Sequence, residues 1–144
     1  MATQNYANHR QFVPAFHYVL AGLLLLTLIG SIVNLWKSFD DHSRLYSASL
    51  IVVLVFSVIM GSVLNRVFAL KAQDRAIRAE ENLRHFAMTG KLLDPRLETR
   101  QIVGLRFASD GEFVALARRA ADENMTEDAI KRAVKNWRPD LYRA

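Results

Sequence analysis

The stretch LNRVFALKAQDRAIRAEENLRHFAMTG, residues 64 to 90, decides how this chain is organised. It follows one of the most apolar segments of the sequence, yet it carries five lysines or arginines and three acidic residues. It contains no proline, and its only glycine is the last residue, Gly90. Nearly every residue after Asn65 is a good helix former, so nothing interrupts a helix before Gly90. We therefore predict one continuous helix that leaves a membrane near Arg66 and continues into water as a stalk.

Two long segments of the chain carry no Lys, Arg, Asp or Glu: residues 11 to 36 and residues 45 to 65. A bilayer core of about 30 Å is crossed by roughly 20 apolar residues in a helix, and both segments meet that length. We predict spans at about residues 16–36 and 46–68, antiparallel because the connection KSFDDHSRLY is short. The alternative is a soluble protein with two buried hairpin helices, which rarely lack charges over such distances. The first span is too long in its apolar part for a cleavable signal peptide.

The basic residues predict the orientation of these spans. The net charge of +5 is concentrated in residues 65–144, where 16 of the 19 basic and 12 of the 14 acidic residues lie. Arg66 lies at the end of the second span, and Lys71, Arg75 and Arg78 follow it closely, whereas the connection between the spans is charge-balanced. Lys and Arg are retained on the cytoplasmic side of a membrane, so we expect both termini in the cytoplasm.

The predicted fold class is an all-α membrane protein with a two-helix transmembrane hairpin. Its segments are an N-terminal cytoplasmic arm (1–15), the hairpin (16–68), a cytoplasmic helical stalk that extends the second span (69–90) and a small helical C-terminal module (91–144). The module has about 50 residues, close to the lower limit for independent folding. We therefore expect the module to be stabilised by contacts with the stalk, with a neighbouring protein or with the membrane surface.

Helix-start signals predict three helices in the module, at about 95–107, 110–123 and 127–137. Asp94 precedes Pro95, a favoured first helical residue. Ser109 and Glu112 have the spacing of a capping box. Thr126 precedes two acidic residues, which suit the first turn of a helix. The predicted apolar faces consist of Leu97, Ile102, Leu105, Phe113, Leu116, Ala117, Ala120, Ile130, Val134 and Trp137.

Small and apolar residues form a heptad stripe along the stalk, here called the alanine stripe: Ala69, Ala72, Ala76, Ala79, Leu83 and Phe86. We interpret it first as a seam for self-association or a docking face. Two alternatives stay open: alanines that serve only as helix formers in a solvated helix, and packing against the C-terminal module of the same chain. The order of charges also predicts ion pairs Asp74–Arg78 and Glu80–Arg84 along the helix.

Within the spans, small and polar residues recur at helical spacing. Such residues favour close packing of helices in lipid, within the hairpin or between copies. A path for a solute is less favoured, because no ionisable group lies at mid-depth. The residues concerned are Thr27, Gly30, Ser31, Asn34, Ser57, Gly61 and Asn65.

The sequence offers little catalytic equipment. It has no phosphate-binding loop, no dinucleotide fingerprint and no nucleophile elbow. Its four histidines lack a metal-ligand spacing, and the absence of cysteine excludes disulfides, thiolate metal sites and cysteine nucleophiles. We predict no catalytic residue, no cofactor, no metal site and no enzymatic activity. A basic surface of the module is a candidate site for anionic lipid or a partner, and less for DNA: Arg118, Arg119, Lys131, Arg132, Lys135, Trp137 and Arg138.

Five blocks of the sequence resemble a family of uncharacterised bacterial two-span inner-membrane proteins, some of which are labelled permease-like. The blocks are QNYANH, PAFHYVLAGL, KAQDRAIRAEENLRH, QIVGLRFASDGE and DAIKRAVKNWRPDLYRA, and together they extend over essentially the whole chain. The resemblance implies a bacterial inner-membrane location but no activity or cofactor. Gly104 departs from the family pattern, which has alanine there, and we expect it to loosen its helix locally. The polar residues that match are Gln73, Asp74, Arg75, Arg78, Glu81, Gln101, Arg106 and Asp110.

The leading functional hypothesis is therefore a non-enzymatic, membrane-anchored interaction or assembly protein. It would oligomerise, or act as a scaffold, through its stalk and C-terminal helices. The second hypothesis is an accessory subunit of a larger transport or respiratory membrane complex. The third and least favoured is a membrane-tethered binder of DNA or anionic lipid.

Overall fold

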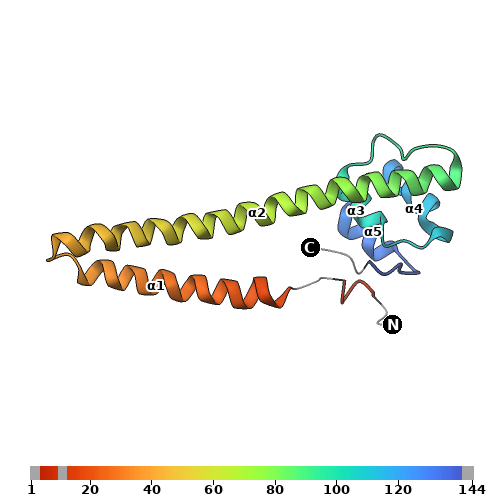
Figure 1. The fold of residues 1–144 in the computed structure, drawn as a ribbon. Helices are drawn as coiled ribbons and strands as arrows, with labels where there is room; N and C mark the ends of the chain where they lie inside the picture. Colours follow the sequence, from red (N-terminus) through yellow and green to blue (C-terminus); the bar gives the residue numbers. More distant parts are fainter. Residues whose placement is uncertain (1–3, 10–12, 141–144) are drawn as a thin grey trace. The chain divides into compact units, whose positions relative to one another are not determined.

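The regular elements of the described residues are all helical (Figure 1), which confirms the predicted all-helical class. The computed structural model describes residues 4–9 and 13–140. Its elements are η1 (Ala15–Leu20, a π-helix), α1 (Ala21–Lys37), α2 (His42–Thr89), α3 (Thr99–Leu105), α4 (Asp110–Asp122) and α5 (Glu127–Ala133). The chain divides into two units, which we describe separately. One is Phe12–Phe68, here called the apolar hairpin, and the other combines Met1–Gln11 with Ala69–Ala144, here called the compact unit.

In the apolar hairpin, η1 and α1 run antiparallel to the first half of α2, beside it (Figure 1). The π-helix follows Pro14, and the amides of Phe16 and His17 both donate to the carbonyl of Val13, at 3.1 and 2.9 Å. At the other end, the carboxylate of Asp41 accepts from the amides at positions 43 and 44, at 3.1 and 3.2 Å. Because a carboxylate at this place satisfies the first free amides of a helix, α2 begins at His42, four residues before the predicted span.

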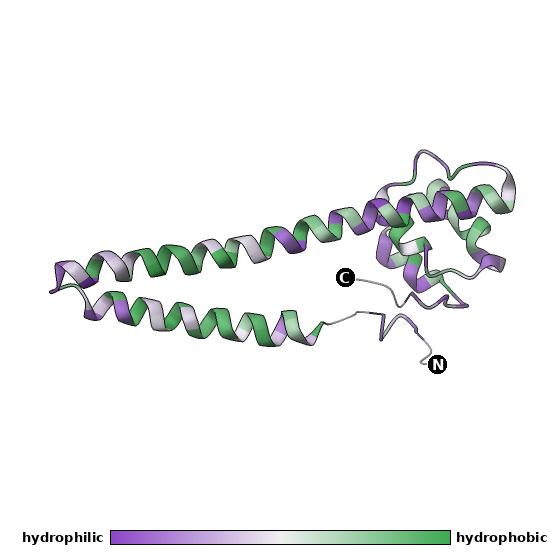
Figure 2. Ribbon diagram, viewed as in Figure 1, coloured by the Kyte–Doolittle hydropathy of each residue, from purple (hydrophilic) through white to green (hydrophobic). Residues whose placement is uncertain are grey.

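The hairpin exposes its apolar side chains. Both helices are long and apolar enough to cross a membrane, yet only 6% and 11% of their most apolar windows are buried. Figure 2 shows hydrophobic residues along both helices. Leu26 and Leu54, for example, are 68% and 62% exposed, whereas Ser31, Ala48 and Val55 are buried. These helices are therefore not the buried core of the structure, as the soluble alternative requires.

Helix α2 is continuous over 48 residues and passes Arg66 without a break. It ends where the sequence predicts, because Gly90 has a φ of 72°, a left-handed conformation that glycine adopts without steric cost. The Gly90 amide donates to the carbonyl of Phe86 at 2.7 Å and so satisfies one of the last helical carbonyls. The predicted uninterrupted helix from residue 45 to residue 89 is confirmed.

The core of the compact unit lies between α3, α4 and α5. Nine of the ten residues on the predicted apolar faces are buried, and the tenth, Trp137, is half-buried and packs against the core. Phe107 and Phe113 are the largest fully buried side chains. Trp137 forms an isolated antiparallel bridge with Ala108, which brings the segment after α5 alongside the start of α4.

The first helix of the module begins later than predicted. The carboxylate of Asp94 accepts from the amide of Arg96 at 2.9 Å, and the backbone carbonyl of Asp94 accepts from the amide of Leu97 at 3.0 Å. These bonds close a turn around Pro95 instead of starting a helix. The helix starts after Glu98, whose amide donates to the Gln101 side chain at 2.7 Å, and it ends at Leu105.

The predicted capping box at Ser109 and Glu112 is wrong. Ser109 precedes α4, but its amide donates to the carbonyl of Asn136 at 3.0 Å. The carboxylate of Glu112 accepts from the amides of Lys135 and Asn136, at 3.1 and 2.9 Å. Glu112 therefore fastens the chain after α5 to the first turn of α4, so α5 ends at Ala133 and not near residue 137. The prediction for Thr126 is confirmed, since its hydroxyl accepts from an amide of the first turn of α5 at 3.2 Å.

Gly104 does not loosen its helix, contrary to our expectation. Helix α3 is continuous through this position. A Cβ added at Gly104 would lie 3.1 Å from the carbonyl oxygen of Glu127 and 3.3 Å from the Cβ of Ile130. The missing side chain therefore allows α5 to pack directly on the backbone of α3.

Candidate functional site

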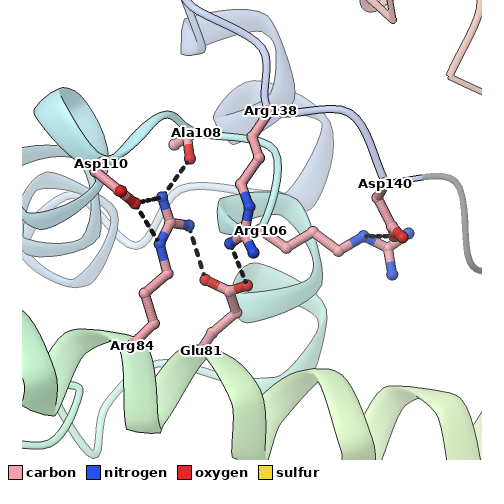
Figure 3. A network of polar contacts seen from close by, with 7 residues as sticks. All are labelled: Glu81, Arg84, Arg106, Ala108, Asp110, Arg138 and Asp140. Atoms are coloured by element: carbon pink, nitrogen blue, oxygen red, sulfur yellow. Dashed lines mark hydrogen bonds and ion pairs between the residues drawn. The ribbon is translucent and has the colours of Figure 1, made fainter.

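A network of charged side chains joins the stalk part of α2 to the start of α4 (Figure 3). Arg84 donates to Glu81 at 3.0 Å, to Asp110 at 2.9 Å and to the carbonyl of Ala108 at 2.8 Å. Its guanidinium carbon lies 4.2 Å from the ring centroid of Phe113, a distance at which a cation is attracted to the ring face. We call this network, completed by Arg138, the polar clamp.

The charges of the polar clamp compensate one another, and the central pair Glu81–Arg84 is poorly solvated, whereas Asp110 and Arg138 are largely exposed. Only 5% of the Glu81 side chain and 12% of the Arg84 side chain are exposed. Arg138 adds a second guanidinium 3.6 Å from Glu81. The hydrogen bond from Arg84, with its positive charge, holds the pKa of Asp110 below its usual value. The buried carboxylate of Glu81 lies between the guanidinium groups of Arg84 and Arg138. This geometry suits a structural role, in which the charges fix the module on the stalk.

A hollow of about 450 Å³ lies beside the clamp. Two arginines and three acidic residues line it, and Arg106 forms an ion pair with Asp140 at 3.2 Å. The mixed charges give the hollow no excess of positive charge that would favour an anion. Among the described residues, no group of three side chains has the composition of a metal site. The lining consists of Gln73, Ala76, Ile77, Glu80, Glu81, Arg106, Arg138, Pro139 and Asp140.

The described part of the N-terminal arm, residues 4–9, packs against the module within the compact unit. The hydroxyl of Tyr6 donates to the carboxylate of Asp128 at 2.5 Å, and the guanidinium of Arg132 lies 4.8 Å from the Tyr6 ring centroid. The ring centroid of His9 is 5.8 Å from that of Phe107 and 5.9 Å from that of Trp137. The bond from Tyr6 lowers the pKa of Asp128 and raises the pKa of Tyr6. No contact of this arm was expected from the sequence. The only available signal was the block QNYANH, which names no partner.

The alanine stripe is not buried against the module, although Ala76 lines the hollow beside the polar clamp together with residues of the module. The stalk packs through another face, on which Ile77 and Glu81 are buried and His85 is half-buried. Packing of the stripe against the module of the same chain therefore has no support from burial, and the seam and the solvated helix stay predictions. All six residues of the stripe are exposed, with Leu83 at 67% and Phe86 at 51%.

The polar residues that match the family blocks separate into two groups. Glu81, Gln101 and Arg106 are buried, and Asp110 belongs to the polar clamp. Gln101 donates to the carbonyl of Met125 at 2.8 Å, which ties α3 to the turn before α5. The remaining residues lie along the stalk, half-buried or exposed: Gln73, Asp74, Arg75 and Arg78.

The two predicted ion pairs along the stalk do not form. Arg84 pairs with Glu81, three residues before it, and with Asp110, so the predicted pair with Glu80 is wrong. The structure likewise has no ion pair between Asp74 and Arg78, both of which it describes. Arg84, the arginine of the stalk that forms ion pairs, therefore contacts the module. Lys71, Arg75 and Arg78, which come earlier in the stalk, form no ion pair with a described residue.

The predicted basic surface of the module is largely neutralised by its own acids. Arg118 pairs with Asp122 at 3.8 Å, Arg119 with Glu123 at 3.4 Å, Lys131 with Glu127 at 2.6 Å, Arg132 with Asp128 at 2.7 Å and Arg138 with Glu81 at 3.6 Å. Lys135 forms no ion pair with a described residue. Trp137 stacks at a tilt on Phe107, with ring centroids 4.9 Å apart. These pairs reduce the positive charge that the module can offer to an anionic partner.

Most of the predicted packing residues of the hairpin lie on its outer surface. Ser31 is buried and Gly61 is half-buried, but the other five are exposed. The hydroxyls of Thr27 and Ser57 donate to helix carbonyls four residues before them, at 2.7 and 2.9 Å. Contact of these residues with another copy stays a prediction. The exposed residues are Thr27, Gly30, Asn34, Ser57 and Asn65.

These features define an all-helical protein in which one long helix connects an exposed apolar hairpin with a compact unit locked by buried charges. The chain belongs to the family of unknown function DUF6526, whose family model matches residues 1–144. This confirms the predicted membership of an uncharacterised family. No curated protein and no solved structure matches the chain.

Proposed function

We propose that the protein is a non-enzymatic assembly protein of the bacterial inner membrane, anchored by the apolar hairpin with both termini in the cytoplasm. Two helices of sufficient length and hydrophobicity, with their apolar side chains exposed, support the anchor. Lysine and arginine beyond the second span support the orientation. In this proposal the stalk associates with a second copy of the chain.

The observation that carries this proposal is the exposed alanine stripe. Its six residues extend over 18 positions of α2, about 26 Å at 1.5 Å per residue. Small side chains at its start let another helix approach closely, and Leu83 and Phe86 supply apolar area at its end. The module packs on the side of α2 that buries Ile77 and Glu81, whereas all six residues of the stripe are exposed. A second helix can therefore reach the stripe, where Ala76 also lines the hollow beside the polar clamp.

Cysteine cross-linking in bacterial membranes tests the seam directly. The chain has no cysteine, so Ala76→Cys introduces a single thiol. Oxidation joins two thiols only when their Cα atoms approach within about 7 Å, so a seam predicts a disulfide-linked dimer. Arg78→Cys is the matched control, because residue 78 is also exposed but lies on roughly the opposite side of α2. Equal dimer yields for both variants, or none for Ala76→Cys, would remove the seam.

Ala76→Glu provides an independent test of self-association. A carboxylate in the middle of an apolar seam must be desolvated on assembly, so the mass of the gently extracted particle should fall to that of the monomer. The hairpin is unchanged in this variant, and membrane insertion should therefore be normal. An unchanged particle mass would favour the solvated alternative for the stripe.

The same extraction distinguishes the other hypotheses. A foreign protein in fixed stoichiometry would support an accessory subunit of a transport or respiratory complex, and a pure homo-oligomer would count against it. The third hypothesis needs free positive charge on the module, and the ion pairs of Arg118, Arg119, Lys131 and Arg132 disfavour it.

A further inference from the structure

We propose that Lys71, Arg75 and Arg78, on the first turns of the stalk, form a binding surface for anionic phospholipid headgroups. We call these three residues the cation face. The inference rests on the membrane anchoring in the proposed function but not on self-association. It assigns lipid binding to the stalk rather than to the module.

The cation face is a single surface of α2. Spacings of four and three residues bring the three side chains to one side of a helix. All three side chains are exposed, and none forms an ion pair with another described residue. Like charges at such spacing repel and destabilise the helix, a cost that an external anion removes.

The contrast with the module makes this surface distinctive. In the module, exposed arginines such as Arg100 and Arg118 have acidic partners at 3.3 and 3.8 Å. Asp74 and Glu80 are close to the cation face in sequence, yet neither forms an ion pair with it. Among the described residues, positive charge without an internal partner is therefore concentrated where the apolar run of α2 ends.

The distance along α2 suits headgroups. With a rise of 1.5 Å per residue, Lys71, Arg75 and Arg78 lie about 9, 15 and 20 Å beyond Asn65, the last residue of the uncharged run. The headgroup layer adds roughly 5–8 Å to each side of the hydrocarbon core, and charge interactions in water extend about 8 Å further. Lysine and arginine side chains are long enough to bring their charges back toward the bilayer. We therefore expect the contributions to decrease in the order Lys71, Arg75, Arg78.

Lipid binding to the purified full chain tests this surface. The protein in mild detergent is titrated with phosphatidylglycerol, and native mass spectrometry counts the lipids retained. Phosphatidylcholine and inorganic phosphate are the comparison ligands. A cation near a membrane surface strengthens binding about five-fold, so replacing all three residues of the cation face by alanine should weaken phosphatidylglycerol binding at least ten-fold. The matched control removes three exposed module cations, by Arg100→Ala, Arg118→Ala and Arg119→Ala, and should change binding less than two-fold.

Several outcomes would overturn the inference. Equal losses in the two triple variants would mean that total charge, and not the cation face, determines binding. Equal retention of phosphatidylcholine would remove the requirement for an anion. Phosphate binding with the same dependence on the cation face would identify a site for soluble anions.

Single substitutions test the predicted order independently. Lys71→Ala should weaken binding more than Arg78→Ala, and the reverse order would contradict the position of the cation face relative to the bilayer. Alanine is a strong helix former, so α2 should persist in each variant. The same spectra report the particle mass. Monomers that retain phosphatidylglycerol would refute self-association alone, and oligomers that ignore the lipid would refute the cation face alone.

Discussion

Replacing Arg84 by methionine should weaken the contact between the stalk and the module and so destabilise the compact unit. The substitution keeps a long side chain next to Phe113 but removes the guanidinium that bonds Glu81, Asp110 and the carbonyl of Ala108. Removing one partner of a buried ion pair costs about 3–5 kcal/mol, because the other charge stays buried. Arg138 lies 3.6 Å from Glu81 and partly compensates that charge, so we expect the lower end, about 3 kcal/mol.

Trp137 provides the assay for this loss. The chain has two tryptophans, so a Trp36→Phe background leaves Trp137, stacked on Phe107, as the only one. Its fluorescence then reports thermal unfolding of the compact unit in the detergent-solubilised full chain. For a unit of this size, 3 kcal/mol corresponds to a decrease in Tm of roughly 12–24 °C.

A surface arginine supplies the control for this experiment. Arg118 is 87% exposed and lies 3.8 Å from Asp122, so Arg118→Met should change the free energy of unfolding by no more than about 0.5 kcal/mol. The double variant Glu81→Leu with Arg84→Met should recover part of the loss, because no buried charge is then left without a partner, and Asp110 and Arg138, which lose theirs, are largely exposed. The reasoning fails if Arg84→Met is as mild as Arg118→Met.

Three further predictions concern the compact unit. Gly104→Val should lower Tm, since overpacking against the Cβ of Ile130, 3.3 Å from the added Cβ, typically costs about 1–3 kcal/mol; an unchanged Tm would show that α5 moves aside freely. Tyr6→Ala should expose the arm to protease by removing the bond to Asp128, and cleavage rates equal to those of the parent chain would mean that the arm is not docked in solution. Hydrogen bonds from the neighbouring arginine lower the pKa of Asp94 to about 2, against an ordinary value of about 3.9, so the stability from this group is complete above pH 4 and lost as the pH falls toward 2. Asp94→Asn should therefore flatten the decrease of Tm between pH 4 and pH 2, and an unchanged slope would contradict the assignment.

The helices of the hairpin, the length of α2 and the core of the module could be predicted, because each depends on a pattern that is continuous along the sequence. Uncharged runs marked the hairpin helices, and the lack of any breaker before Gly90 predicted the length of α2. The core of the module followed from apolar periodicity. Each of these signals is local to one helix and needs no knowledge of what packs against it.

The predictions of helix starts failed where a polar side chain could bind either the amides of its own helix or amides elsewhere in the chain. Asp94 and Glu112 both have the spacing of helix caps. The structure uses Asp94 to close a turn and Glu112 to bind the amides of Lys135 and Asn136, more than 20 residues away. Local spacing cannot distinguish a cap from a tertiary contact, because the side chain and the free amides are the same in both.

Residues of the candidate site were named from the sequence, but they were not predicted to form one site. Glu81, Arg106 and Asp110 were singled out as polar residues of the family blocks, but Arg84 was assigned to Glu80. On a helix, Glu80 and Glu81 are both within reach of Arg84. Only the packing of the module shows which of them is buried beside it, and the face toward the module was not the one with the clearest heptad pattern.

The docked arm has a consequence for how the protein is made. Tyr6 bonds a residue 122 positions later in the chain, so this contact can form only after the intervening residues and the module have been synthesised. The segments before and after the apolar hairpin belong to one unit, so the membrane anchor that we propose requires both segments to lie on the same side of the bilayer. Under that proposal, the compact unit is completed only after both hairpin helices have been inserted. A bulky N-terminal fusion would delay that step while leaving the helices themselves intact.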